Sequence, residues 1–454
     1  MKISTHITAA LLALGIVSQV SADPVVYLTG STAFRSTVEA TLANNSGTNA
    51  GGLFDAGSVT METWGNANPA SANYMIFHGT INGSPIYVNC AWSGSEAGIA
   101  SACNTTLTNV DRNGNPLALA GSPEVWVDVS NAAVDLTAPP GITNTANPSS
   151  SIEENGGVPF HGADLAQADT SQAVSWTPYK AGTQTALKSY GVEAVVTFVW
   201  TKNVQTVASN EWLDMTNVTL PQIDVMLANG VEPAGFFSGN TNDNDFTVYL
   251  VGRNLGSGTR MNELSDSLYG GHNPVQQYSI GYGCGDPGDP AQENALILTN
   301  EANNGYESGS GVAKALANTG SCQQPDPFNG GKGWFAIGMV GPADALNTGN
   351  YGGEPTNNWL TVDGVPESNA AIENGPYYFW GHENLYGKFG ITNPQDDVGN
   401  RLLKEIKATM ALPAFHYGLN PGDHDPGILG QYMNVGKSSD TAFPTPGNTG
   451  NGYP

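Results

Sequence analysis

This 454-residue chain is poor in basic residues, in cysteine and in long apolar runs. Its 15 Lys and Arg residues stand against 40 acidic ones, which gives a formal net charge of -25. Binding to nucleic acid depends on cations that displace counterions around phosphates, so we expect no nucleic-acid partner. After the first 22 residues no apolar run approaches the length of a membrane-spanning helix.

The N-terminus has the pattern of a secretory signal peptide. Lys2 precedes an apolar run at residues 9–17, and small residues end at Ala22. We predict a signal peptide over residues 1–22, which is removed on export. No cysteine follows the cut, so we expect no lipid anchor and a periplasmic or secreted protein.

The four cysteines, an even number, suit an oxidising compartment. They allow three pairings, of which Cys90 with Cys103 and Cys284 with Cys322 are nearest in sequence. No C-x-x-C spacing occurs and no histidine lies close to a cysteine, so we predict disulfides and no metal site.

Residues 251–260, VGRNLGSGTR, form the most informative motif. Arg253 can donate two hydrogen bonds to one oxyanion, and Ser257 and Thr259 add hydroxyl donors. Gly256 and Gly258 let backbone N–H groups approach a ligand closely. The next residues suit a helix, whose N-terminus attracts negative charge. The motif predicts a site for a tetrahedral anion.

Two earlier segments repeat this pattern of strand, small-residue turn and helix. Residues 25–29 (VVYLT) indicate a strand, and Gly30, Ser31 and Thr32 form the turn before a helix. Residues 86–90 indicate a second strand, and residues 92–99 (WSGSEAGI) carry its turn into a helix. In the first turn, Ser31 or Thr32 could instead serve simply as an N-cap.

The rest of the chain alternates strands with helices. Residues 123–129, 192–200, 246–251 and 334–340 indicate strands, and residues 219–229 and 401–410 indicate helices. This order predicts an α/β fold with mostly parallel sheets, in which ligands bind beyond the carboxyl ends of strands. We expect a surface loop over about residues 137–160 and a flexible tail over residues 436–454.

Four segments in this order resemble the extracytoplasmic phosphate-binding proteins of ABC importers, a branch of the type 2 periplasmic binding proteins. They are GSTAFRSTVEA at residues 30–40, WSGSEAGI at residues 92–99, the arginine motif, and LTVDGVPESNAAIENGPYYFWGHENLYG at residues 360–387. The resemblance implies two α/β lobes that close on an anion. It places the first lobe at residues 23–197, the second at residues 198–375, and the return to the first at residues 376–435.

The resemblance also implies the ligand, the partner and the site. It predicts inorganic phosphate or a related oxyanion as ligand, the membrane permease of an ABC importer as partner, a monomer, no cofactor and no catalytic residue. The implied ligand-binding residues are Ser31, Thr32, Ala33, Ser93, Gly94 and Ser95 from the first lobe and Arg253, Ser257, Gly258, Thr259 and Arg260 from the second.

One position departs from the family. An aspartate that accepts a proton from hydrogen phosphate is expected after residues 123–129, where this alignment gives Ala133, with Asp128 and Asp135 as neighbours. Without that carboxylate, discrimination against sulfate-like dianions weakens. A sulfate-like ligand is therefore an alternative.

Two other classes of function remain open. A hydrolase would need a base beside Ser95 or Ser257, but no histidine lies in the anion turns and no G-x-S-x-G motif occurs. A secreted two-lobed interaction protein with a lost or altered pocket is the other alternative.

Overall fold

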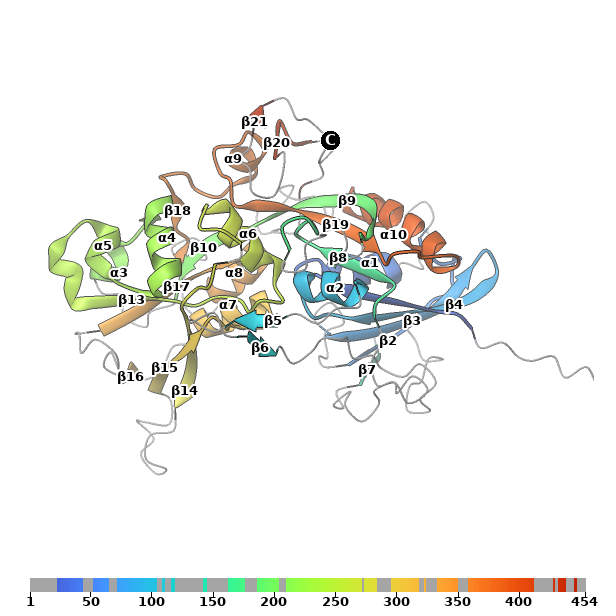
Figure 1. Ribbon diagram of the computed structural model, residues 1–454, viewed down its shortest axis with the longest axis horizontal. Helices are drawn as coiled ribbons and strands as arrows, with labels where there is room; N and C mark the ends of the chain where they lie inside the picture. Colours follow the sequence, from blue (N-terminus) through green and yellow to red (C-terminus); the bar gives the residue numbers. More distant parts are fainter. Residues whose placement is uncertain are drawn as a thin grey trace, which may run out of the picture.

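The computed structural model describes residues 23–43, 52–64, 72–103, 108–110, 116–118, 142–144, 162–175, 186–203, 210–271, 273–283, 295–317, 322–323, 333–349, 358–411, 428, 432–437 and 445–446. These residues form two α/β lobes that lie end to end (Figure 1). The expected two-lobed α/β fold is confirmed. The predicted signal peptide, the strand at residues 123–129 and Ala133 lie outside the described residues.

The first lobe is built on one eight-stranded sheet. Its order is β7 (Ile142–Asn144), β2 (Thr60–Trp64), β3 (Tyr74–Ile81), β4 (Ser84–Ala91), β1 (Val25–Gly30), β8 (Leu165–Ala168), β19 (Trp380–Gly387) and β9 (Lys188–Thr197). Strand β1 runs parallel to both β4 and β8, whereas β19 is antiparallel to β8 and β9. The sheet is therefore mixed rather than mostly parallel, because β2, β3 and β4 form a meander and the returning strand β19 runs against its neighbours.

Helices cover both faces of this sheet. Leu165 shares a core cluster with Val398 and Leu402 of α10 (Gln395–Met410), which contacts α1 (Arg35–Ala43). The next residue, Ala166, packs instead with Ile99 of α2 (Ser95–Ala102). Because successive strand residues point to opposite faces, α1 and α10 lie on one face and α2 on the other.

The second lobe has a four-stranded sheet in the order β10 (Val199–Lys202), β17 (Gly333–Val340), β13 (Phe246–Leu250) and β12 (Val231–Pro233). Val248 and Leu250 of β13 belong to one apolar cluster, and Tyr249 belongs to the other, so both faces of this strand are buried. Parallel pairing joins only β13 and β17 among the described strands of this sheet.

The remaining described elements complete the lobes. They are β5 (Thr108–Val110), β6 (Pro116–Ala118), α3 (Asn210–Asp214), β11 (Asn217–Val218), α4 (Leu220–Asn229), α5 (Ala234–Ser238), the 3-10 helix η3 (Thr241–Asp245), α6 (Gly258–Asp266), β14 (Gln277–Gly283), β15 (Ala295–Ala302), α7 (Gly309–Ala317), β16 (Cys322–Gln323), α8 (Pro342–Gly349), β18 (Thr361–Val362), α9 (Asn369–Glu373), β20 (Val435–Gly436) and β21 (Thr445–Pro446). In the described part of the chain, no helix is long and apolar enough to cross a membrane.

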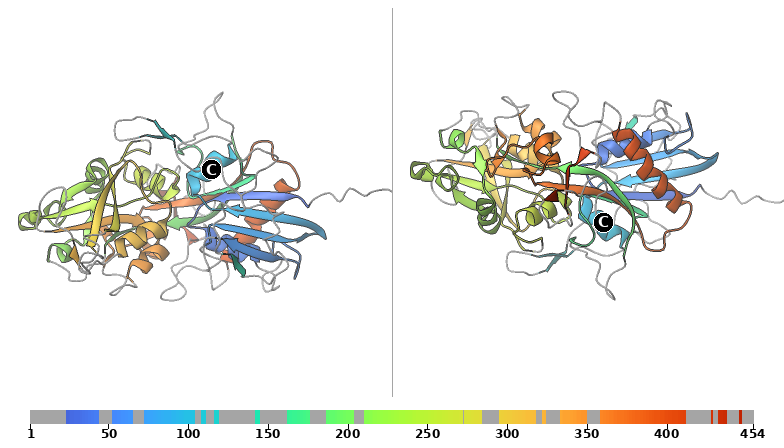
Figure 2. Two further views of the ribbon diagram at one scale, coloured as in Figure 1. Left: turned by 90° about the horizontal axis from the view of Figure 1, so that it is seen from below. Right: turned by 90° about the horizontal axis from the view of Figure 1, so that it is seen from above.

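Two adjacent crossings join the lobes. The chain leaves the first sheet at the end of β9, passes through Phe198 and enters β10 of the second sheet. It returns through Phe379 into β19, and the Phe198 N–H donates to the Phe379 carbonyl at 3.1 Å. Figure 2 shows these strands running between the two halves of the molecule. The crossings form the only described covalent links between the two sheets.

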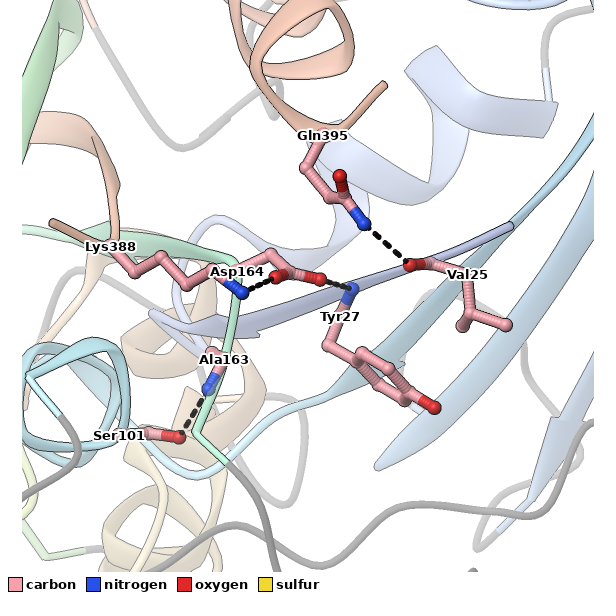
Figure 3. A network of polar contacts seen from close by, with 7 residues as sticks. All are labelled: Val25, Tyr27, Ser101, Ala163, Asp164, Lys388 and Gln395. Atoms are coloured by element: carbon pink, nitrogen blue, oxygen red, sulfur yellow. Dashed lines mark hydrogen bonds and ion pairs between the residues drawn. The ribbon is translucent and has the colours of Figure 1, made fainter. Parts of the chain in front are cut away.

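A polar network fixes the start of β8 (Figure 3). Asp164 accepts from the Tyr27 N–H at 3.0 Å and pairs with the ammonium group of Lys388. The adjacent Ala163 N–H donates to the Ser101 hydroxyl at 3.1 Å, which ties the strand to α2. The network holds β8 between β1 and β19, with its carboxyl end toward the second lobe.

Residues 436–437, at the start of the expected flexible tail, are packed, and most of that tail lies outside the described residues. Val435 and Gly436 pair with β21, and Lys437 is 1% exposed. Its ammonium group binds the Asp266 carboxylate, and it donates to the Trp380 carbonyl at 2.5 Å. The start of the tail is thus held by a buried ion pair that charge composition alone could not predict.

The predicted disulfide between Cys90 and Cys103 is wrong. Neither thiol forms a disulfide. Cys90 lies in β4 and belongs to the main core cluster, whereas Cys103 follows α2 and accepts from the Gln172 amide at 3.3 Å. Burial raises the pKa of the Cys103 thiol to about 11. Cys284 lies outside the described residues, so the second predicted pair remains a prediction.

Candidate functional site

The three predicted anion turns meet where the lobes face each other. The Gly94 N–H, before α2, donates to the Gly30 carbonyl at the end of β1 at 2.9 Å. The N–H groups of Glu96 and Ala97 donate to the Gly256 carbonyl of the second lobe at 3.0 and 3.3 Å. Turns that are far apart in sequence therefore touch, and the second contact bridges the lobes.

Glycine is required at two of these contacts. A Cβ atom on Gly94, whose φ is 107°, would lie 2.3 Å from the Gly256 carbonyl oxygen. A Cβ atom on Gly258, the first residue of α6, would lie 1.6 Å from Oδ1 of Asp169. The glycine spacing in the motif thus reflects close approach between the lobes.

The predicted hydroxyl residues all lie at this junction. Ser31 is buried, and its Oγ forms no hydrogen bond within the described part of the chain. Ser93 and Thr29 share a hydrogen bond of 3.3 Å, and Ser95 accepts from the Asp169 N–H at 3.2 Å. Ser257 is the N-cap of α6 and accepts from the Arg260 N–H at 3.2 Å. Thr32 and Ala33 are half-buried just before α1.

Arg253 is buried, and two backbone carbonyls hold its guanidinium group. Its Nε donates to the Tyr306 carbonyl at 3.3 Å and its Nη2 to the Glu307 carbonyl at 2.8 Å. Nη1 forms no hydrogen bond with any described residue and lies 3.6 Å from where a Cβ atom on Gly309 would be. Burial lowers the pKa of Arg253, an effect that Asp169 and Asp344 oppose. Backbone carbonyls therefore orient the guanidinium through Nε and Nη2.

Arg260 is held by polar groups of its own lobe. Its Nη1 donates to the carbonyls of Arg253 and Asn303 at 3.1 and 2.9 Å, and its Nη2 binds the Asn303 side chain. Burial lowers the pKa of Arg260 to about 10, and Glu263 opposes that change. These bonds join Arg260 to the Arg253 turn, and its contact with a ligand stays a prediction.

Asp169 is the residue that the sequence did not reveal. It follows β8 at the carboxyl edge of the sheet, beside the first anion turn, and it is 2% exposed. Its Oδ2 accepts from the Thr259 hydroxyl of the second lobe at 3.3 Å, and its Oδ1 has no hydrogen-bond partner among the described residues. Burial raises the pKa of Asp169, while Ser95, Arg253 and Thr259 oppose the shift.

Arg35 of the first lobe and Asp344 of the second lobe are oppositely charged residues near Arg253. Burial lowers the pKa of Arg35, in the first lobe, to about 10, and Asp344 of α8 opposes the shift. Asp344 has its own pKa raised by burial, against the effects of Arg253 and Arg35. The Arg35 Nη1 donates to the Asn73 side chain at 3.2 Å. Two guanidinium groups therefore offset nearby carboxylates, although the whole chain is strongly acidic.

Across the described residues, no group of three or more His, Cys, Asp or Glu side chains is placed to hold a metal ion. The acidic turn at Asp243 instead binds Ser238 and Asn240, so it serves as local structure.

Comparison with family models and with curated proteins gives no match. Three solved structures are similar. A putative phosphate ABC transporter substrate-binding protein with bound phosphate from Clostridium perfringens has 14% identity over 84% of this chain and 92% of that chain, with a TM-score of 0.37. PstS from Borrelia burgdorferi has 10% identity over 86% and 94%, with a TM-score of 0.33. An ABC-type phosphate transport receptor from Vibrio cholerae has 14% identity over 59% and 84%, with a TM-score of 0.29.

The chain is similar to substrate-binding proteins of phosphate ABC transporters. All three neighbours are named as binding or transport proteins. With TM-scores under 0.5, the functional assignment depends on the geometry of the junction itself.

Proposed function

We propose that this protein is an extracytoplasmic solute-binding protein that captures inorganic phosphate, or a similar tetrahedral oxyanion, between its lobes for uptake by an ABC permease. The observation that carries the proposal is the meeting of three helix N-terminal turns from two lobes around Arg253. Helix N-termini and an oriented guanidinium both favour an oxyanion.

The donors come from both lobes, which suits capture by closure. The first lobe offers the Ser31 hydroxyl, which has no hydrogen-bond partner within the described residues. The second offers Arg253 Nη1 and the start of α6 at Gly258 and Thr259. An anion held by both sets would stabilise the closed arrangement, because it binds that state with more donors than either lobe provides alone.

Asp169 favours phosphate over sulfate. A carboxylate beside an anion repels it unless the anion carries a proton to donate, and hydrogen phosphate does so at neutral pH. The sequence alignment placed Ala133 where the family has an aspartate in this role. That substitution weakened the expected preference for phosphate over sulfate. Asp169, with its free Oδ1, fills the role instead.

One observation favours an alternative, a two-lobed interaction protein with an altered pocket. The Glu96 and Ala97 N–H groups already donate to the Gly256 carbonyl, so these two donors at the start of α2 are engaged by the other lobe. In that case the lobes would close on each other and no anion would bind.

Catalysis by Ser95 or Ser257 has little support in the geometry. Each Oγ accepts a hydrogen bond from a backbone N–H, of Asp169 and Arg260 respectively. A nucleophilic serine requires a base within hydrogen-bond reach of its proton. We therefore propose a binding protein without enzyme activity, and an assay for phosphatase activity checks this directly.

Calorimetry separates the binding protein from the interaction protein. The protein is unfolded to release bound anion, refolded, and titrated with phosphate, arsenate, sulfate and molybdate. We expect heat with a 1:1 stoichiometry for phosphate and arsenate and weaker binding of sulfate. The absence of heat with all four anions would reject the proposal and support the interaction protein. We further propose export by the signal peptide at residues 1–22 and a monomer in the periplasm.

A further inference from the structure

A buried glutamate lies behind the first anion turn and has no role in the site as described so far. Glu383 on β19 has no solvent exposure, and neither carboxyl oxygen forms a hydrogen bond with a described residue. A buried carboxyl group without partners is costly in its charged form. Such a group is retained only where the neutral acid is useful or where another group binds it.

Strand register places Glu383 beside the anion turn. Asn384 pairs with Ala168, so Glu383 lies next to Asp169, the residue after β8. The Ser31 N–H donates to the Gln167 carbonyl of the same strand at 2.9 Å, which brings the turn to this edge. The Ser31 hydroxyl lies close enough to lower the pKa of Glu383, yet its Oγ, like both carboxyl oxygens, completes no hydrogen bond in the described structure.

The charges around Glu383 decide which carboxyl group holds a proton. Glu193 on β9 accepts two hydrogen bonds of 3.1 Å from the Gln167 amide and is opposite Lys407 of α10. Asp169 has Thr259, Ser95 and Arg253 to stabilise its charge.

Glu383 has no such support. Burial raises the pKa of Glu383 well above its usual value, and the carboxylates of Asp169 and Glu193 raise it further. Only the Ser31 hydroxyl opposes the shift. Neighbouring carboxyl groups in unequal surroundings divide into one acid and one base.

We propose that Glu383 is a positioning residue for the anion site: as the neutral acid it donates its proton to Ser31 Oγ, and the Ser31 hydroxyl donates its own proton to the bound anion. This inference rests on the proposed function. The acid fixes the orientation of a hydroxyl that is otherwise free to rotate. Ionised Glu383 can only accept from Ser31, which turns the hydroxyl away from the anion and places a negative charge behind it.

The test compares the affinity for phosphate of the full-length wild type and three variants by calorimetry from pH 5.5 to pH 10. Glu383→Gln keeps a donor for Ser31 at every pH, and Glu383→Leu fills the space without a donor. Glu62→Gln is the matched control, because Glu62 is also buried but lies on β2, which is not adjacent to β19. Phosphate itself titrates over this range. The ratio of each variant's affinity to the wild-type affinity at the same pH removes that effect.

We expect Glu383→Gln to match the wild type within about threefold at pH 6 and to bind at least tenfold more tightly at pH 10, while Glu383→Leu is weaker than both at pH 6. Glu62→Gln should follow the wild type across the range. If the wild type and Glu383→Gln both bind phosphate and their affinities change with pH in parallel, this inference is overturned while the proposed function stands. If no protein binds any oxyanion, the proposed function fails and this inference fails with it.

Discussion

Thr259 donates a hydrogen bond of 3.3 Å from its hydroxyl to Oδ2 of Asp169, and the two residues belong to different lobes. Thr259 is in the first turn of α6, and Asp169 follows β8 of the first sheet. Both side chains are buried. The bond joins the second lobe's anion turn to the carboxylate that we propose selects a protonated anion.

Arg253 should dominate affinity. Replacing Arg253 by alanine removes the charged donor Nη1 and also releases the turn at residues 306–307. We expect phosphate affinity to fall by about 2 to 3 kcal/mol, or roughly 30- to 150-fold. Calorimetry measures the loss. The control is Arg401→Ala, which removes an exposed arginine that pairs with Asp397 on α10. Equal affinities of the Arg253 and Arg401 variants would contradict the assignment.

Asp169 should control the choice of anion. In Asp169→Asn the amide can donate to an unprotonated oxygen, so sulfate no longer meets a repelling carboxylate. We expect the ratio of phosphate to sulfate affinity to fall by roughly 10- to 100-fold. Competition titrations give the ratio directly. Asp164→Asn, which alters a buried carboxylate in the network of Figure 3, should leave it unchanged. A ratio that survives in Asp169→Asn would exclude this role.

Glu193 should make stability depend on pH. Burial raises its pKa from 4.5 to about 8, with Gln167 and Lys407 opposing the shift. The folded protein therefore holds this proton where the unfolded chain has lost it. The contribution is complete below pH 4.5 and is lost as pH rises toward 8, at no more than about 1.4 kcal/mol per pH unit.

Urea unfolding at pH 5, 6.5 and 8 tests this linkage. The free energy of unfolding of the wild type should decline relative to that of Glu193→Gln over this interval. Burial also raises the pKa of Glu263 to about 8. The variant Glu263→Gln therefore serves as a comparison. If the wild type and Glu193→Gln keep a constant difference, Glu193 is ionised in the folded protein.

Lys437 should stabilise the whole protein. Lys437→Met leaves the Asp266 carboxylate buried without its cation, which costs about 3 to 5 kcal/mol. Thermal unfolding gives the change, and Lys404→Met is the control because its side chain is 80% exposed. Similar melting temperatures for the two variants would show that the segment at residues 432–437 is loosely held.

The sequence predicted elements that depend on local patterns. The strand of β13 and the capped helix α4, with Thr219 at its start and left-handed Gly230 at its end, match the structure closely. The three anion turns were also found, because glycine and hydroxyl residues between a strand and a helix leave a local pattern.

Features that depend on distant contacts were missed or wrongly assigned. Asp169 follows a strand of only four residues, two of them alanine, which carries little strand signal. The sequence also could not show that the Asn303 carbonyl accepts from the Arg260 guanidinium. Cys90 was paired with Cys103 by proximity in the chain, although one lies in a strand and the other ends a helix.

The central claim is that the three turns form one anion site across the lobes. The most direct test is an amide NMR titration of the refolded, anion-free protein with inorganic phosphate. The account predicts that the largest shifts, saturating at one equivalent, occur at residues 31–33, 93–95 and 257–259. Shifts confined to other residues, or no shifts at saturating phosphate, would contradict it.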